Sequence, residues 1–162
     1  DCVVRVGALQ DSGLIARPLG KLQMVNCASP AYLQKYGCPQ NATDLQSHQM
    51  VHYQNAQVGH SDRFEYVTAQ GDVQQVEMQG ALTVNSTESY SAACIAGLGI
   101  IQVPIIGVRH ALDTGTLVAI LPQLSPPAMP VSLLYPHRRN LARRVQVFMD
   151  WMSDIIRQQY VH

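Results

Sequence analysis

The segment from Gly80 to Pro104 constrains the fold of this chain more than any other, and it reads GALTVNSTESYSAACIAGLGIIQVP. It predicts a strand over Ala81–Val84, a polar corner at Asn85–Thr87 and a helix of small residues over 88–96. A Gly-x-Gly stop and a buried strand from Ile100 follow. The first turn of such a helix has backbone N–H groups without helical partners. These groups, with the positive end of the helix dipole, favour a small anion or polar ligand.

Helix and strand signals alternate along the rest of the chain. The stretch Ser29–Gly37 combines a serine–proline helix start with a glycine stop, and residues 69–72 predict a hairpin turn. A strand over Val131–Tyr135 precedes an amphipathic helix from Leu141 to about Gln159. Alternating strands and helices around a central hairpin predict an α/β fold rather than a barrel or a bundle.

The composition narrows the class of protein. With 162 residues, 47% of them hydrophobic and 14% charged, the chain has enough apolar side chains for one compact domain or two small lobes. Its formal net charge is zero, which argues against direct nucleic-acid binding by this segment. It has no apolar run of the length that a membrane span needs, so we expect no membrane partner.

Metal, cofactor and catalytic sites are not predicted. The four cysteines are scattered through the sequence: Cys2, Cys27, Cys38 and Cys94. No Cys-x-x-Cys or paired Cys/His spacing occurs, and the predicted strand between His48 and His52 removes the helical spacing of a zinc pair. No Ser/His/Asp or Cys/His arrangement indicates an enzyme. Free cysteines indicate a reducing, cytoplasmic location.

Several short motifs occur in an order typical of one known family. In chain order they are DCVVRVG at the start, DSGLIARPLG, CASPAYL, LTVNSTES, AACIAGLGI, YPHRR and VFMDWM. Each motif is weak alone, but the ordered set covers almost the whole chain. It resembles the effector-binding domain of LysR-type transcriptional regulators.

This resemblance implies a fold like that of periplasmic binding proteins, with two α/β lobes, a cleft between them and two crossover strands as a hinge. Residues 1–20 and 131–162 would form the first lobe and hinge, and residues 21–130 the second lobe. The second lobe would be complete and the first partial, because the family's opening strand-helix-strand unit has no counterpart in this sequence. The family's helix-turn-helix domain and linker helix have none either.

The resemblance also implies a function, which is to sense a small-molecule effector, anionic or aromatic, in the interlobe cleft. The parent regulator would be a cytoplasmic homo-oligomer that contacts DNA only through its helix-turn-helix domain. The alternative is a stand-alone solute-binding protein of the same fold that supplies a transporter. The free cysteines and the absence of a signal peptide from the sequence favour the regulator.

The polar corner supplies the first candidate ligand-binding residues, Asn85, Ser86 and Thr87. The competing interpretation is that one of them only caps the helix, by accepting a hydrogen bond from a free N–H. Both roles are compatible, since a cap at the edge of a cleft leaves other donors open.

The family's cleft supplies five further candidates: Arg5, Val6, Gly7, Tyr135 and Pro104. The glycine would let the backbone approach a ligand closely. The arginine is also interpreted as solvent-exposed or paired with a structural acid. The tyrosine is equally a packed aromatic at the hinge. The proline would shape the cleft wall.

Overall fold

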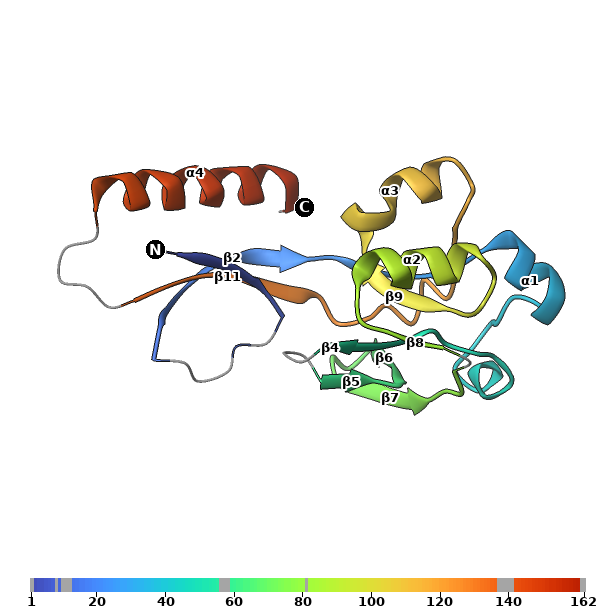
Figure 1. Ribbon diagram of the computed structural model, residues 1–162. Helices are drawn as coiled ribbons and strands as arrows, with labels where there is room; N and C mark the ends of the chain where they lie inside the picture. Colours follow the sequence, from blue (N-terminus) through green and yellow to red (C-terminus); the bar gives the residue numbers. More distant parts are fainter. Residues whose placement is uncertain are drawn as a thin grey trace. The chain divides into compact units, whose positions relative to one another are not determined.

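The computed structural model describes residues 2–7, 9, 13–55, 59–80, 82–136 and 142–160. The chain divides into two compact units (Figure 1). Unit 1 consists of Asp1–Gln23 and Ala128–His162, and unit 2 of Met24–Pro127.

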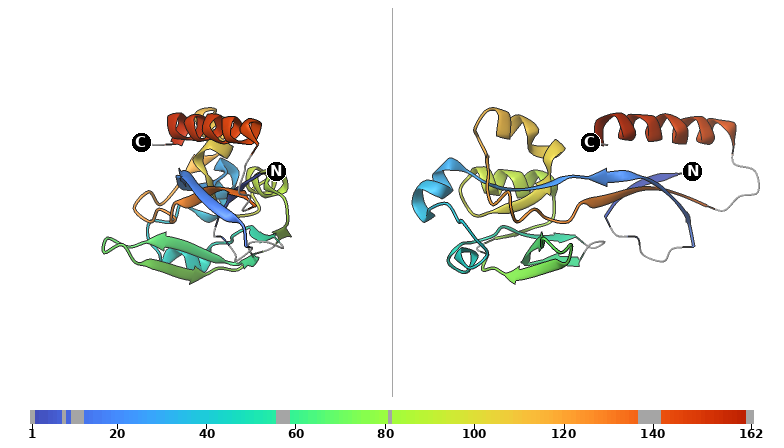
Figure 2. Two further views of the ribbon diagram at one scale, coloured as in Figure 1. Left: turned by 90° about the vertical axis from the view of Figure 1, so that its left-hand side faces the viewer. Right: turned by 180° about the vertical axis from the view of Figure 1, so that it is seen from behind.

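Unit 1 is a three-stranded antiparallel sheet with one helix packed on it. Its central strand, β11 (Met129–Tyr135), pairs with β1 (Val3–Val6) on one side and β2 (Ile15–Leu22) on the other. The helix α4 (Arg143–Tyr160) runs alongside these strands (Figures 1 and 2). Leu141, predicted to start this helix, lies outside the described residues.

The packing of α4 follows its amphipathic pattern. Its buried Val145, Met149 and Ile156 join one hydrophobic cluster with Leu19 and Leu133 of the sheet. The outward side of the helix has the single tryptophan of the chain, Trp151, which is 56% exposed. The predicted buried face of this helix is confirmed at these positions, but it is wrong at Phe148, whose side chain is 42% exposed.

Unit 2 contains the longer succession of strands and helices. Its strands form two three-stranded sheets, β10-β3-β9 and β5-β4-β8, and one hairpin, β6-β7. The strands are β3 (Met24–Ala28), β4 (His52–Asn55), β5 (Gly59–Ser61), β6 (Arg63–Val67), β7 (Val73–Glu77), β8 (Thr83–Val84), β9 (Ile101–Pro104) and β10 (Val118–Ala119). The helices are α1 (Pro30–Tyr36), the short 3-10 helix η1 (Asp44–Ser47), α2 (Thr87–Ile95) and α3 (Ile105–Asp113).

A parallel bridge between Met50 and Ile100 links the two three-stranded sheets. The bridge brings two backbones very close at Gly99. A Cβ at this position would lie 2.9 Å from backbone atoms of Gln49, Met50 and Val51. The second glycine of the Gly-x-Gly stop is therefore required by close packing, whereas the first, Gly97, follows the C-cap of α2 with a φ of 82°.

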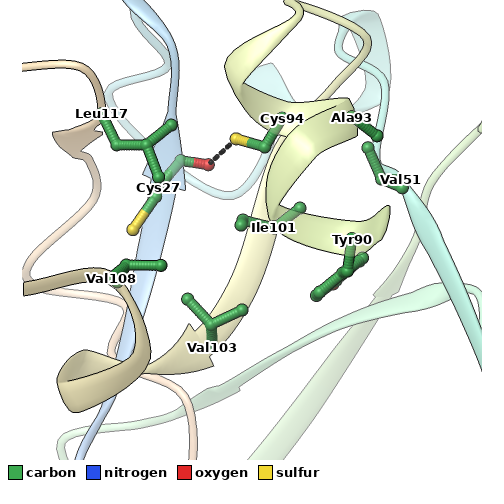
Figure 3. Packing of buried hydrophobic residues seen from close by; sticks show 9 residues of the cluster. All are labelled: Cys27, Val51, Tyr90, Ala93, Cys94, Ile101, Val103, Val108 and Leu117. Carbon is green, nitrogen blue, oxygen red and sulfur yellow. Dashed lines mark hydrogen bonds between the residues drawn. The ribbon is translucent and has the colours of Figure 1, made fainter. Parts of the chain in front are cut away.

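Neighbouring residues of the strands pack into opposite clusters, as the alternation of side chains along a strand requires. Cys27, Val51 and Ile101 pack with α2 and α3 in one cluster, shown in Figure 3. Their neighbours in sequence, including Met50 and Ile100, pack with α1 and the β6-β7 hairpin in a second cluster. Figures 1 and 2 show α2 and α3 on one side of β9 and the hairpin on the other.

The local signals of α1 and the hairpin are confirmed. The Ser29 hydroxyl accepts a hydrogen bond from the Tyr32 N–H at 3.3 Å, and the Gly37 N–H donates to the Leu33 carbonyl. In the hairpin, β6 and β7 pair antiparallel across the predicted turn, where the Thr68 N–H donates to the Asp72 carbonyl at 2.8 Å.

Candidate functional site

The carboxyl ends of three strands of unit 2 lie at one edge. β4 and β8 are parallel, with His52 opposite Thr83 and Tyr53 opposite Val84. The bridge from Met50 to the residue before β9 is also parallel. In α/β sheets, ligands bind outside the carboxyl ends of parallel strands. This edge of unit 2 is the candidate site.

Four of the predicted ligand residues lie at or just after these strand ends. Asn85, Ser86 and Thr87 follow β8, and Pro104 ends β9. Two helices begin there, α2 after Ser86 and α3 after Pro104. The proline forms no side-chain cap hydrogen bond, so it leaves the first-turn N–H groups of α3 uncapped by its own side chain.

Ser86 is the N-cap of α2. Its Oγ accepts a hydrogen bond from the Ser89 N–H at 3.2 Å and donates to the Ser89 Oγ at 3.0 Å. Asn85 and Thr87 are exposed on either side of the cap. The capping interpretation therefore holds for Ser86, and contact of these three residues with a ligand stays a prediction.

The first turn of α2 already carries a negative charge. A hydrogen bond with its own backbone N–H lowers the pKa of the exposed Glu88 carboxyl, and the hydroxyls of Ser86 and Thr87 contribute to the shift. A carboxylate at this end of a helix is favourable because it faces the positive end of the dipole. A ligand at this corner therefore meets N–H and hydroxyl donors beside one carboxylate.

Two tyrosines support the corner from within unit 2. The Tyr90 ring lies 5.3 Å from the Tyr53 ring, between centroids, so α2 contacts β4 directly. Burial raises the pKa of the Tyr90 hydroxyl, which accepts a hydrogen bond from the Gln102 N–H at 3.3 Å. No sequence motif indicates a role for Tyr90, which stands out only as a large aromatic residue in a helix of small residues.

The remaining candidates belong to unit 1. Arg5 and Val6 lie opposite Ser132 and Val131 on the neighbouring strand, and the Gly7 N–H donates to the Pro130 carbonyl at 2.9 Å. Gly7 has a φ of 100°, a conformation that favours glycine. The ligand role of these residues stays a prediction.

The structure does not bring Tyr135 next to Gly7. The tyrosine lies opposite Ile15 at the far end of β11, and its half-buried side chain packs against the hydrophobic cluster of unit 1. Val6 pairs with Val131, four residues earlier on β11, which corresponds to roughly 13 Å along a strand. Gly7 and Tyr135 therefore lie near opposite ends of β11.

Among the described residues, no group of three or more His, Cys, Asp and Glu side chains is placed to hold a metal ion. Cys27 and Cys94 are free and buried, and burial raises the pKa of each thiol to about 12. The Cys94 thiol donates to the Cys27 carbonyl at 3.6 Å (Figure 3). Both are protonated near neutral pH and unreactive.

None of the helices within the described ranges combines the length and the hydropathy of a membrane span.

The sequence is similar to parts of known bacterial proteins. Residues 1–156 match the family described as LysR substrate binding domain. The chain is 50% identical over 158 residues to the uncharacterized HTH-type transcriptional regulator YhjC of Escherichia coli (strain K12), covering 98% of this chain and 52% of that protein. It is 36% identical over 154 residues to the HTH-type transcriptional activator AaeR of the same strain, covering 95% and 49%. The chain thus spans about half the length of these curated relatives.

The fold is similar to that of a solved regulator. The full-length structure of the Vibrio cholerae virulence activator AphB, a member of the LTTR protein family, matches with a TM-score of 0.77 and 27% identity. The match covers 96% of this chain and 51% of that chain. These likenesses confirm the predicted fold class, an α/β fold of the two-lobe, periplasmic-binding-protein-like kind.

Proposed function

Because the chain belongs to the LysR substrate-binding domain family, we propose that it is the effector-sensing region of a LysR-type transcriptional regulator. The observation that carries the proposal is the family match over residues 1–156, together with a ligand-type edge in unit 2. The relatives are HTH-type regulators, which favours this role over a stand-alone solute-binding protein.

In unit 2, the proposed effector contacts are Asn85, Ser86, Thr87 and Pro104. The exposed amide and hydroxyl at 85 and 87 offer donors and acceptors beside the first turn of α2. The start of α3, where Pro104 forms no side-chain cap hydrogen bond, offers further N–H donors. We propose a small effector with an acceptor group, anionic or on an aromatic ring, that binds at this edge.

In unit 1, the proposed contacts are Arg5, Val6, Gly7 and Tyr135, and each is open to test by its own substitution. We also propose the lobe boundaries expected from the sequence, with residues 1–20 and 131–162 as the first lobe and hinge and residues 21–130 as the second lobe.

Regulation would follow from a population shift. An effector changes the balance between two conformations only by the difference in its affinity for them, and such couplings are typically about 1–3 kcal/mol. The parent protein would contact DNA through a helix-turn-helix domain, as the names of the relatives suggest. We also propose that this parent protein is a cytoplasmic homo-oligomer. No catalytic step is part of this proposal.

The proposal is tested by a thermal-shift screen of the purified chain against small carboxylic acids and aromatic compounds, with calorimetry on each hit. The double variant Asn85→Ala/Thr87→Ala keeps the Ser86 cap, so it alters the corner without removing the helix start. We expect the Kd of this variant to be at least roughly tenfold higher. A hydrogen bond to a charged ligand group contributes about 1.5 kcal/mol or more to binding.

The matched control is Thr116→Ala, an exposed threonine after the end of α3. It should bind the hit with unchanged affinity. Equal affinity in the double variant and the control would reject the corner as the effector site, and the absence of any hit in a broad screen would count against sensing by this chain.

A further inference from the structure

The strand that contains β4 changes its neighbour partway along its length. At the start, the Ile100 N–H donates to the Gln49 carbonyl at 2.8 Å and the Val51 N–H donates to the Ile100 carbonyl at 3.0 Å. Two residues on, Tyr53 pairs with Ser61 of β5. Along a strand, alternate residues direct their N–H groups to the same side. The Gln102 N–H, on the same side as that of Ile100, therefore points past the Met50–Ile100 bridge, to where β4 pairs with β5 instead.

The hydroxyl of Tyr90 occupies this position in the hydrogen-bond pattern. It accepts the Gln102 N–H at 3.3 Å, and the Tyr90 side chain is buried, with 5% exposure. A buried backbone N–H without an acceptor is costly. The Tyr90 hydroxyl therefore stabilises this position by supplying the acceptor that a neighbouring strand would otherwise supply.

Tyr90 also belongs to the first turn of α2. Its N–H donates to the Ser86 carbonyl at 3.0 Å, which is the first backbone hydrogen bond of the helix. The same residue is thus bonded through its backbone to the cap of the polar corner and through its side chain to β9. The position of Asn85–Thr87 relative to the strand ends depends on this link.

The Gln102 side chain extends the link to the β6-β7 hairpin. Its Nε2 donates to the Glu65 carbonyl at 2.8 Å and to the Asn26 Oδ1 at 2.7 Å. Its Oε1 accepts the Glu65 N–H at 2.9 Å. One residue of β9 therefore holds both the corner, through Tyr90, and the hairpin, through Glu65.

We infer that Tyr90 is a positioning residue for the effector corner and that Gln102 couples this corner to the β6-β7 hairpin. That the corner binds an effector rests on the proposed function, but the coupling between the corner and the β6-β7 hairpin does not. Movement of the first turn of α2 on ligand binding changes the Tyr90–Gln102 bond, and Gln102 transmits the change to the backbone of Glu65. The hairpin is the element of unit 2 that responds to the corner.

Hydrogen exchange of individual amides, followed by NMR without any ligand, tests the inference. In Tyr90→Phe we expect the Gln102 amide to lose roughly tenfold to a hundredfold of its protection, because a buried donor loses its acceptor. The amides of Ser89 and Tyr90 should lose protection with it, and that of Glu65 to a smaller extent. The matched control is Tyr53→Phe, which alters the other ring of the pair, whose hydroxyl has no hydrogen bond to the described part of the protein.

A purely stabilising role would lower protection everywhere in unit 2 by one common factor, including at the Leu33 amide in α1. That result, or unchanged exchange at Gln102, would overturn the inference. A second variant, Gln102→Leu, keeps the backbone bond to Tyr90 and removes the side-chain bonds. It should lower protection at Glu65 and spare Ser89; equal loss at both would also overturn it. Failure of the effector screen would leave these exchange results unaffected.

Discussion

The Tyr32 hydroxyl lies at the centre of a buried to part-buried hydrogen-bond group between α1 and the segment after η1. It accepts the Gln49 N–H at 2.8 Å, lies 3.3 Å from the Gln49 carbonyl and is hydrogen-bonded to His48 Nδ1 at 3.1 Å. The Tyr32 side chain is 1% exposed, so water does not replace these contacts. We therefore expect Tyr32→Phe to be strongly destabilising although it removes a single atom.

The magnitude follows from the groups left without a partner. The ring stays in place, so there is no large cavity, and the principal cost is the Gln49 N–H, which loses its acceptor. A buried donor in that state costs about 1–3 kcal/mol, so we expect a loss of about 2 kcal/mol in the free energy of unfolding. For a chain of this length, each kcal/mol lowers Tm by about 2–4 °C, which gives a fall of about 4–8 °C.

Urea unfolding followed by circular dichroism measures this loss. The matched control is Tyr36→Phe, whose ring centroid lies 4.7 Å from that of Tyr32 but whose side chain is exposed. The control should change stability by less than about 0.5 kcal/mol, as is usual for surface positions. A loss in Tyr32→Phe no larger than that of the control would refute the hydrogen-bond reasoning.

Three further predictions concern other residues. Burial lowers the pKa of His48 below its ordinary 6.5, so the unfolded chain binds the proton more readily than the folded chain. The free energy of unfolding should therefore fall as the pH falls below 6.5. Measured between pH 5 and 8, this pH dependence should be smaller in His48→Gln. Alkylation under native conditions should label the exposed Cys38 rapidly and spare Cys27 and Cys94 until urea is added, as mass spectrometry would show. Phe64→Ala should cost about 3–5 kcal/mol in denaturant unfolding, since its side chain is fully buried; a cost below 1 kcal/mol would contradict the packing.

Much of the fold could be predicted because its signals are local. The serine–proline start and glycine end of α1 are contained in nine consecutive positions, Ser29–Gly37, and the hairpin turn in four, 69–72. The polar corner was predicted for the same reason. Which of its residues caps α2 was open, because serine, threonine and asparagine all serve as N-caps. The backbone of Ser86, with φ −129° and ψ 150°, decides it.

The rest of the site depends on contacts distant in sequence. Gln102 and Asn26 are 76 positions apart, and no local pattern indicates that they form a hydrogen bond. Similarly, the sequence of β4 does not reveal that the strand leaves β9 for β5, because the choice of neighbour depends on tertiary packing. Tyr90 was missed for this reason, since its significance comes from the amide that it reaches.

The single tryptophan makes the two units optically distinguishable. Trp151 lies on α4 and belongs to unit 1, whereas unit 2 has tyrosines and no tryptophan. Tryptophan emission and far-ultraviolet circular dichroism, recorded on one sample during unfolding, therefore compare the melting of the smaller unit with that of the whole chain. Coincident curves would mean that both units unfold as one cooperative body.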